Sequence, residues 1–390
     1  MPGSLGRVAR ILIVGGGVGG LAVALALHKA GAEPVVYEAH PCGGQDLGAF
    51  LTLASNGMLA LAQVDAARVV AEAGFPLTTM RVVAKTGAEV ASVPLGLHED
   101  ALTRYRCLRR AELCAALRAE VLRRGIAVRH GKRLVSAREE PGAVTAVFGD
   151  GSTATGELLI GADGLNSVTR SLIDPGGAPP RYAGQHVFYG YTTVAYGEPE
   201  RIEMIRGSGA AFGHAVSPAG ETYWFARVPG EELPAEQIAA TTPELWRERL
   251  MALLRPDATP AADIVAATGD RLMVTNACDL PAVERWRTAR TLLIGDAAHA
   301  ASPATGQGAS MALEDAIVLA KALRDAPSMD VALETYELLR RPRVEHNIAN
   351  SARLTAGRAP SPARPRPAGP AGVPDEELVR QLDWAAPISG

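Results

Sequence analysis

A run of glycines near the N-terminus has the spacing of a loop that binds the diphosphate of a dinucleotide. Residues 15–20 fit Gly-x-Gly-x-x-Gly, directly after the short apolar run Ile-Leu-Ile-Val and before an apolar helical segment at 21–30. Gly15 would permit a tight turn, Gly17 a close approach of the backbone to the diphosphate, and Gly20 close packing of helix on strand. Unpaired N–H groups and the dipole at the start of that helix would stabilise the bound anion.

An acidic residue follows this loop at the distance expected for contact with a ribose. Glu38 comes 18 residues after Gly20, at the end of a second strand predicted over 34–38. A carboxylate there can accept hydrogen bonds from ribose hydroxyls. The spacing therefore predicts a strand–helix–strand unit that binds a dinucleotide, and the alternative is a glycine-rich turn with a surface glutamate.

A second acidic residue, Asp296, follows a buried strand predicted over 291–294 near the other end of the chain. Its carboxylate can accept hydrogen bonds from a polyol such as a ribityl chain. A loop rich in proline and glycine comes next and opens a helix predicted over 310–323. Backbone amides at 306–309, at the start of that helix, would stabilise negative charge on a reduced flavin ring. Together these features favour FAD over NAD as the resident dinucleotide.

Three linked motifs resemble those of the group A flavoprotein monooxygenases, the family of para-hydroxybenzoate hydroxylase. The resemblance covers roughly residues 10–354. It is carried by the segments 295–308 with Glu314 and Asp315, 161–164 with Ser167 and Arg170, and 110–113. The segment 48–53 is most similar to the branch with tetracycline-inactivating and aurachin-type monooxygenases. Many relatives have arginine and asparagine where this chain has Gln45 and Ser310.

The resemblance implies an enzyme with FAD as resident cofactor, NADPH or NADH as transient reductant, and O2 as co-substrate. In this family reduced flavin forms a C4a-hydroperoxide, which hydroxylates or epoxidises an electron-rich, usually aromatic, small molecule, here in aromatic or natural-product metabolism. The flavin supplies the difficult chemistry, so no catalytic side chain is assigned. Two alternatives remain at this point: a flavoprotein reductase or dehydrogenase on the same fold, and a non-catalytic flavin-binding carrier of intermediates.

The residues expected to contact the cofactor come from both ends of the chain. They are Gly15, Gly17, Val18, Gly20, Glu38, Ala39, Thr52, Arg110, Leu134, Asp163, Asp296, Pro303, Gly306, Gln307, Gly308, Ala309 and Ser310. Two of these residues have a structural alternative to cofactor contact. Arg110 could be a solvated residue at a helix start, and Asp163 could cap the following helix. His299 beside Asp296 is interpreted as a packing or hydrogen-bonding group rather than a catalytic one.

The substrate pocket is expected to draw on aromatic residues of the middle of the chain. The candidates are Phe188, Tyr191, Phe212, Trp224 and, from the late loop, Pro303. Side chains alternate between the two faces of a strand, so at most half of the aromatic residues in these strands can face one pocket. Core packing is the alternative for the rest.

The predicted fold class is α/β, with a Rossmann-like FAD-binding domain of the para-hydroxybenzoate hydroxylase type and an inserted antiparallel sheet for the substrate. The expected boundaries are 1–180 with 276–355 for the FAD-binding domain and 181–275 for the substrate domain. A linker rich in proline, alanine and arginine is expected at 356–372, followed by a tail at 373–390 that could form a short helix and dock through Trp384.

Composition limits the other classes of function. The 390 residues are 47% apolar and 21% charged, with a formal net charge of −3, which offers no basic surface for nucleic acid or anionic membranes. Four scattered cysteines suggest neither a metal site nor a disulfide framework. The apolar stretch at 11–27 is interrupted by glycines and does not suit a signal peptide. We therefore expect a cytoplasmic monomer or homodimer that binds a small molecule.

Overall fold

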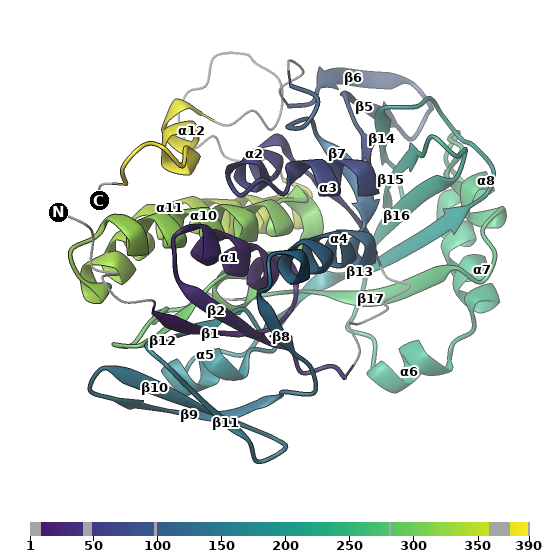
Figure 1. Cartoon of the computed structure of the whole chain (residues 1–390). Helices are drawn as coiled ribbons and strands as arrows, with labels where there is room; N and C mark the ends of the chain where they lie inside the picture. Colours follow the sequence, from purple (N-terminus) through teal and green to yellow (C-terminus); the bar gives the residue numbers. More distant parts are fainter. Residues whose placement is uncertain (1–8, 42–48, 97–99, 281, 359–374, 389–390) are drawn as a thin grey trace.

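The computed structural model describes residues 9–41, 49–96, 100–280, 282–358 and 375–388. A five-stranded parallel sheet carries the dinucleotide motifs (Figure 1). Its strands, in spatial order, are β18 (Thr291–Leu293), β12 (Leu158–Gly161), β1 (Arg10–Val14), β2 (Glu33–Tyr37) and β8 (Ala127–Arg129). All four pairings are parallel, which fits the apolar runs because such strands are buried on both faces. The predicted Rossmann-like architecture is confirmed.

The N-terminal strand–helix–strand unit forms as the sequence predicts. Helix α1 (Val18–Lys29) begins just after the glycine turn and is apolar almost all round, so nine of its residues are buried. It packs on β1 and against α10 (Gly308–Asp325), which covers the same face of the parallel sheet. The long helix α11 (Met329–Thr355) packs against α10 and closes this layer.

The opposite face of the parallel sheet is covered by a second, smaller sheet. Its strands are β9 (Leu134–Glu140), β10 (Ala143–Phe148) and β11 (Thr153–Gly156). Tyr37 stacks on Phe148 with ring centroids 4.7 Å apart, and Leu134 packs in the same buried cluster. The remaining α-helices of this part are α2 (Ser55–Gln63), α3 (Ala67–Ala73), α4 (Arg110–Arg123), α5 (Val168–Ile173) and the one-turn helix α9 (Asp296–His299).

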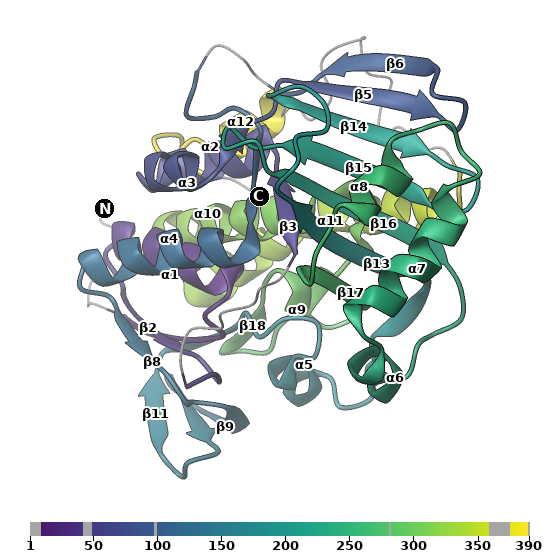
Figure 2. The same ribbon diagram turned by 90° about the vertical axis from the view of Figure 1, so that its right-hand side faces the viewer.

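A seven-stranded sheet stands beside the parallel sheet (Figure 2). In spatial order its strands are β17 (Leu272–Asp279), β13 (Arg181–Thr192), β16 (Thr222–Pro229), β15 (Ala211–Val216), β14 (Arg201–Arg206), β5 (Thr79–Ala84) and β6 (Glu89–Pro94). The sheet is not purely antiparallel, because β5 pairs parallel with β14. It also recruits β5 and β6 from the range expected to belong to the FAD-binding domain. The sequence of the β5–β6 hairpin does not show which sheet it joins, because its place depends on the long-range pairing of β5 with β14.

The two faces of the seven-stranded sheet have different neighbours. Helices α7 (Pro243–Leu254) and α8 (Ala261–Ala266) cover the outer face, with α6 (Ala235–Ala240) nearby (Figure 2). The inner face meets a small sheet whose strands are β3 (Phe50–Leu53), β7 (Arg106–Arg109) and β4 (Phe75–Pro76). The space between this inner face and the parallel sheet is where the site lies.

The C-terminal tail docks on the FAD-binding part of the chain, as expected. Helix α12 (Glu376–Leu382) is followed by Trp384, whose ring lies against Lys29 and Arg324. The buried Lys321 ammonium donates hydrogen bonds to three backbone carbonyls of the tail, among them that of Gln381 at 2.7 Å. Most of the expected linker, 359–372, lies outside the described residues, as do the first two residues of the expected tail and, elsewhere in the chain, Gln45 and Gly48.

Candidate active site

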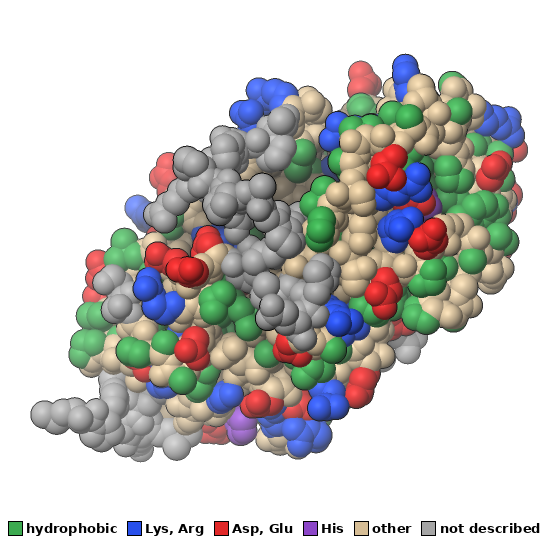
Figure 3. All heavy atoms as spheres, turned by 90° about the horizontal axis from the view of Figure 1, so that it is seen from above, with side chains coloured by type: hydrophobic (Ala, Val, Ile, Leu, Met, Phe, Trp, Pro, Cys, Tyr) green, Lys and Arg blue, Asp and Glu red, His purple; other side chains and the backbone are tan. Residues whose placement is uncertain are grey.

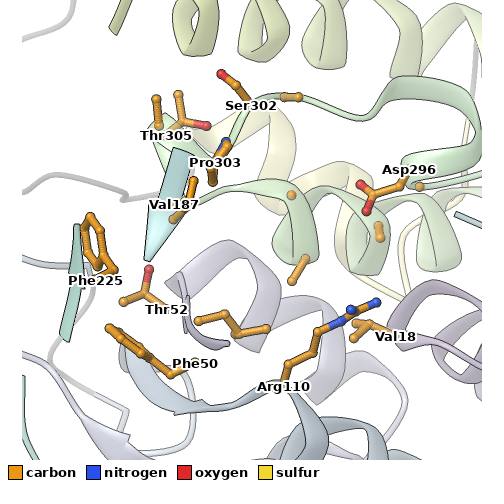
Figure 4. Close-up of a pocket in the computed structure, with 18 of the residues that line it drawn as sticks. Val18, Phe50, Thr52, Arg110, Val187, Phe225, Asp296, Ser302, Pro303 and Thr305 are labelled. Carbon is orange, nitrogen blue, oxygen red and sulfur yellow. The ribbon is translucent and has the colours of Figure 1, made fainter. Parts of the chain in front are cut away.

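A cavity of about 400 Å³ opens between the parallel sheet and the inner face of the seven-stranded sheet. One end is formed by the glycine loop and the start of α10, and the other by apolar side chains of the sheet. Figure 4 shows Val18, Arg110 and Asp296 toward one side, and Phe50, Val187 and Phe225 toward the other. The loop with Pro303 and Thr305 borders the cavity between them.

The glycine loop has the geometry that its spacing predicts. Gly15 has a φ of +107°, and a Cβ at Gly20 would lie 1.9 Å from the carbonyl oxygen of Gly15, so both positions exclude a side chain. At Gly17 an added Cβ would meet no atom within 4 Å, and this residue lines the cavity together with Val18. The loop therefore presents open backbone to the cavity at Gly17.

Glu38 lies over this loop. Its carboxylate accepts hydrogen bonds from the backbone amides of Gly16 at 2.6 Å and His40 at 2.8 Å. These two contacts hold the carboxylate at the end of β2, next to Ala39. An ionised carboxylate has about four acceptor positions, so acceptor capacity is left for a further donor.

Asp296 follows β18 and lines the cavity with its side chain exposed. Its Oδ1 lies 3.9 Å from the position that a Cβ on Gly308 would take, at the first residue of α10. Among the described residues no hydrogen-bond donor to this carboxylate is found. The structure thus places a free acceptor beside a helix start that has no acidic residue in its first turn.

The turn that carries Asp296 is held from behind by buried charges. Asp315 accepts hydrogen bonds from the amide of Gly295 at 2.9 Å and from the Nε2 of His299 at 2.6 Å, and it pairs with Arg340 at 2.7 Å. Although burial alone would raise the pKa of Asp315, His299 and Arg340 hold it below its ordinary value. His299 is buried against Trp286 and does not line the cavity, so the packing interpretation is confirmed.

Several residues expected at the cofactor have structural partners instead. Asp163 accepts hydrogen bonds from the Ser167 hydroxyl at 2.5 Å and the Thr169 amide at 2.9 Å, which is the capping alternative. Ser310 is fully buried and accepts from the amide of Ala54 at 3.2 Å. Gln307 accepts from Asn56 at 3.2 Å. None of the three lines the cavity, and neither does Leu134. The neighbouring Ala162 and Gly164, Gly306, Gly308 and Ala309 do line it.

Two expected cofactor contacts do reach the cavity from the small sheet and its helix. Thr52 on β3 lines it, and its hydroxyl is 3.2 Å from where a Cβ on Gly306 would lie. Arg110, the first residue of α4, extends its exposed side chain along the cavity near Val18 (Figure 4). Its backbone amide donates to the carbonyl of Ala49 at 3.0 Å, which fixes the start of α4 against the strand that bears Thr52.

Three of the aromatic residues expected in the substrate pocket face away from the cavity. Phe188 packs edge-on against Trp246 of α7, Trp224 donates to the Thr268 hydroxyl at 2.8 Å, and Phe212 stacks on Trp224. This corrects their assignment to the cavity face. The physical reason is strand alternation: helices α7 and α8 cover the outer face, and these residues fill that interface.

Tyr191 is on the inner face but beyond the cavity, where its ring meets Tyr223 and the guanidinium groups of Arg109 and Arg271. Pro303 lines the cavity as expected. Other side chains line this end of the cavity instead. From the seven-stranded sheet they are Met80, Val187, Tyr189, Ile202, Met204, Phe225 and Arg227, and from other segments Phe50, Leu51, Leu95 and Tyr105. The sequence contains one signal for the face that lines the cavity: Arg227 interrupts the otherwise apolar strand that carries Phe225.

The residues at the end of the cavity formed by the glycine loop and the start of α10 fit an FAD. A backbone concavity at Gly17 without a clashing side chain suits a diphosphate. The carboxylate of Asp296, which has no donor among the described residues, suits a polyol, and the start of α10 suits the electron-rich part of a flavin ring. These groups together are those of a dinucleotide site. The described residues contain no group of three or more His, Cys, Asp or Glu side chains that could hold a metal.

The family model for the FAD binding domain matches residues 8–351. The chain belongs to this family. An aurachin C monooxygenase/isomerase of Stigmatella aurantiaca is 30% identical over 353 residues, covering 88% of this chain and 88% of the relative. The 3-amino-4-hydroxybenzoate 2-monooxygenase PtnB3 of Streptomyces platensis is 33% identical over 347 residues, covering 86% and 85%.

A solved structure, Klebsiella pneumoniae HpxO complexed with FAD and uric acid, superposes with a TM-score of 0.79 at 29% identity, covering 90% of this chain and 89% of that one. The resemblance to the group A monooxygenases is confirmed, and with it the aurachin-type branch. The chain is therefore a flavoprotein monooxygenase with FAD as its cofactor, and NAD(P)H and O2 complete the family reaction.

Other surfaces say less about function. On the face shown in Figure 3, acidic and basic side chains are interspersed, in keeping with the small net charge. Within the described part of the chain, no helix combines the length and the apolar character needed to cross a bilayer.

Proposed function

We propose that this enzyme inserts one oxygen atom into an electron-rich aromatic small molecule bound at the sheet end of the cavity. The observation that carries the proposal is the composition of that end. Aromatic and thioether side chains surround it, among them Phe50, Phe225 and Met204, directly beside the loop of Pro303. A flat apolar ring fits such a lining, because aromatic faces and methionine sulfur both pack well on aromatic ligands. Aromatic substrates also occur in the names of relatives such as the aminohydroxybenzoate monooxygenase.

We assign the cofactor contacts as follows. Gly17 and Val18 hold the diphosphate at the start of α1, Glu38 accepts from the ribose of the adenosine, and Asp296 accepts from the ribityl hydroxyls. Arg110 lies along the cofactor end and neutralises negative charge there. When bound, FAD supplies the redox chemistry by taking electrons from NAD(P)H and activating O2.

The protein side of the reaction is positioning and exclusion of water. The amides of Gly308 and Ala309 at the start of α10 stabilise the negative charge that builds up on the cofactor side. The apolar wall of Phe50, Leu51 and Phe225 keeps water from the reacting centre. Exclusion of water suppresses side reactions that would consume activated oxygen without forming product.

The test uses the FAD-loaded enzyme with NADPH or NADH, isotopically labelled O2 and a panel of phenols, quinolones and indoles. We expect at least one compound to stimulate NAD(P)H oxidation and to gain a single labelled oxygen atom, detected by mass spectrometry. Stimulated oxidation that yields only hydrogen peroxide for every compound in the panel would contradict the proposal. A flavin that NAD(P)H does not reduce under any of these conditions would contradict it as well.

A further inference from the structure

Arg227 on β16 has an unusual position for an arginine. It lines the cavity, yet its Nε and Nη1 are buried and have no hydrogen-bond partner among the described residues. Burial lowers the pKa of its guanidinium, partly offset by the nearby Tyr189 hydroxyl. Even so, a guanidinium remains charged in proteins. The described part of the structure therefore gives this cation no ion-pair partner inside an otherwise apolar wall.

The register of the sheet places Arg227 at the end of the cavity away from the dinucleotide residues. Its Cα pairs with that of Val187, and Phe225 lies two residues away on the same face. Figure 4 shows Val187 and Phe225 on the side of the cavity opposite Asp296, which is the acidic residue among the described lining side chains. No carboxylate of the described lining thus pairs with Arg227.

An unpaired buried charge destabilises a fold, so its presence calls for a partner that arrives with a ligand. The cofactor end already has Arg110 and the start of α10 for negative charge. The substrate end has Arg227 and, on the neighbouring strand β13, Tyr189, which also lines the cavity; their side chains are two donors set in an apolar surround. Such a pair suits one anionic oxygen group on a flat apolar body.

We infer that Arg227 binds a carboxylate or ionised hydroxyl of the substrate, so that the enzyme selects aromatic anions over their neutral analogues. This inference rests on the proposed function, since it names the substrate class of the same cavity. Arg227 is a specificity-determining residue: its charge-assisted hydrogen bonds orient the ring within the cavity, and Tyr189 adds a neutral donor.

The experiment measures binding, so it does not depend on turnover. The FAD-loaded enzyme is titrated with 2-naphthoate and with its neutral isostere 2-naphthamide, and binding is followed by the change in flavin absorbance and by isothermal calorimetry. We expect wild type to bind the acid at least about tenfold more tightly, the scale of a hydrogen bond to a charged group. In R227M that preference is lost, while R227K, which keeps the charge but not the fork of donors, retains part of it.

Two further measurements separate ligand recognition from a structural or flavin-contacting role. R227M without ligand should keep its FAD content and flavin spectrum and show an equal or higher Tm, because an unpaired buried charge is removed. The control R206M removes an exposed arginine of β14, two strands away from β16 in the same sheet, and should leave the preference unchanged.

Three results would overturn the inference: no preference for the acid in wild type, an unchanged preference in R227M, or loss of FAD and folding in R227M together with full preference in R227K. Failure of oxygen insertion with every panel compound, with the acid preference intact, would instead count against the proposed reaction alone.

Discussion

The carboxylate of Asp315 accepts a hydrogen bond from the amide of Gly295, 2.9 Å away and one residue before Asp296. This contact ties the cavity acid to a carboxylate that is itself fully buried between His299 and Arg340. The position of Asp296 therefore depends on a charge network of residues that do not line the cavity. The network connects β18, α10 and α11, three elements that meet only in the folded protein.

Replacing Asp315 with asparagine should destabilise the protein by about 3–5 kcal/mol, because Arg340 is left as a buried cation with one partner fewer. FAD should also be held less tightly, since the turn of Asp296 loses its anchor. Urea unfolding and FAD titration by fluorescence measure the two effects. The matched control D330N breaks an ion pair whose aspartate is 76% exposed, and it should change stability by no more than about 1 kcal/mol. Equal effects of the two variants would contradict the role assigned to the network.

Two alanine substitutions in the glycine loop should have opposite consequences. In G20A the new Cβ would collide with the Gly15 carbonyl at 1.9 Å, so the protein should fail to fold. In G17A the new Cβ meets nothing, so folding and the Tm of the apoprotein should match wild type, while FAD affinity falls by about tenfold or more as the diphosphate is pushed away. Circular dichroism measures folding and the Tm, and titration with FAD measures the affinity for the cofactor. A G17A protein with wild-type FAD affinity would remove Gly17 from the cofactor site.

The two faces of the seven-stranded sheet can be separated by a pair of phenylalanine variants. Phe188 lies in the core against α7, so F188A should lower the free energy of unfolding by about 3–5 kcal/mol. Phe225 lines the cavity, so F225A should keep more of its stability and instead raise the KM for aromatic substrates or the Kd for naphthoate. If F188A altered ligand binding more than F225A, the assignment of the faces would be wrong.

Acid should destabilise the protein through carboxylates that are ion-paired in the folded state. Hydrogen bonds from Arg123, assisted by Arg124, lower the pKa of Glu120 from 4.5 to about 2 despite its burial. Because the folded pKa is below the unfolded one, this contribution is complete above pH about 4.5 and is lost as the pH falls toward about 2. Urea titrations at a series of acidic pH values should therefore show a shallower decline for E120Q than for wild type. The variant E248Q, at an exposed glutamate of α7, should follow the wild-type curve.

The sequence predicted most reliably what depends on short stretches of chain. The glycine turn, Glu38 at the end of β2 and Asp296 after β18 each sit within a few residues of the strand that positions them. Ser310 falls in an equally recognisable motif, but its hydrogen bond from the amide of Ala54 depends on packing that the motif does not reveal.

The substrate end was harder to predict for a different reason. Strand β13 carries aromatic residues on both faces, and alternation shows that Phe188 and Tyr189 point in opposite directions without saying which one meets the cavity. That choice is made by helices α7 and α8, more than fifty residues later in the chain. Met80 and Leu95 reach the cavity only because β5 pairs with β14, a contact without a local signal.

Strand β18 pairs with β12, which lies beside β1, so this edge of the parallel sheet is completed only after residues 291–293 have been synthesised. The glycine turn at 15–20 is synthesised well before Asp296, the acidic residue expected to bind the same cofactor. Until β18 has been synthesised, the nascent polypeptide has an unpaired, apolar strand edge at β12 that must be kept from aggregating. A cofactor that contacts both the glycine turn and Asp296 can join these segments only after the second one has been synthesised.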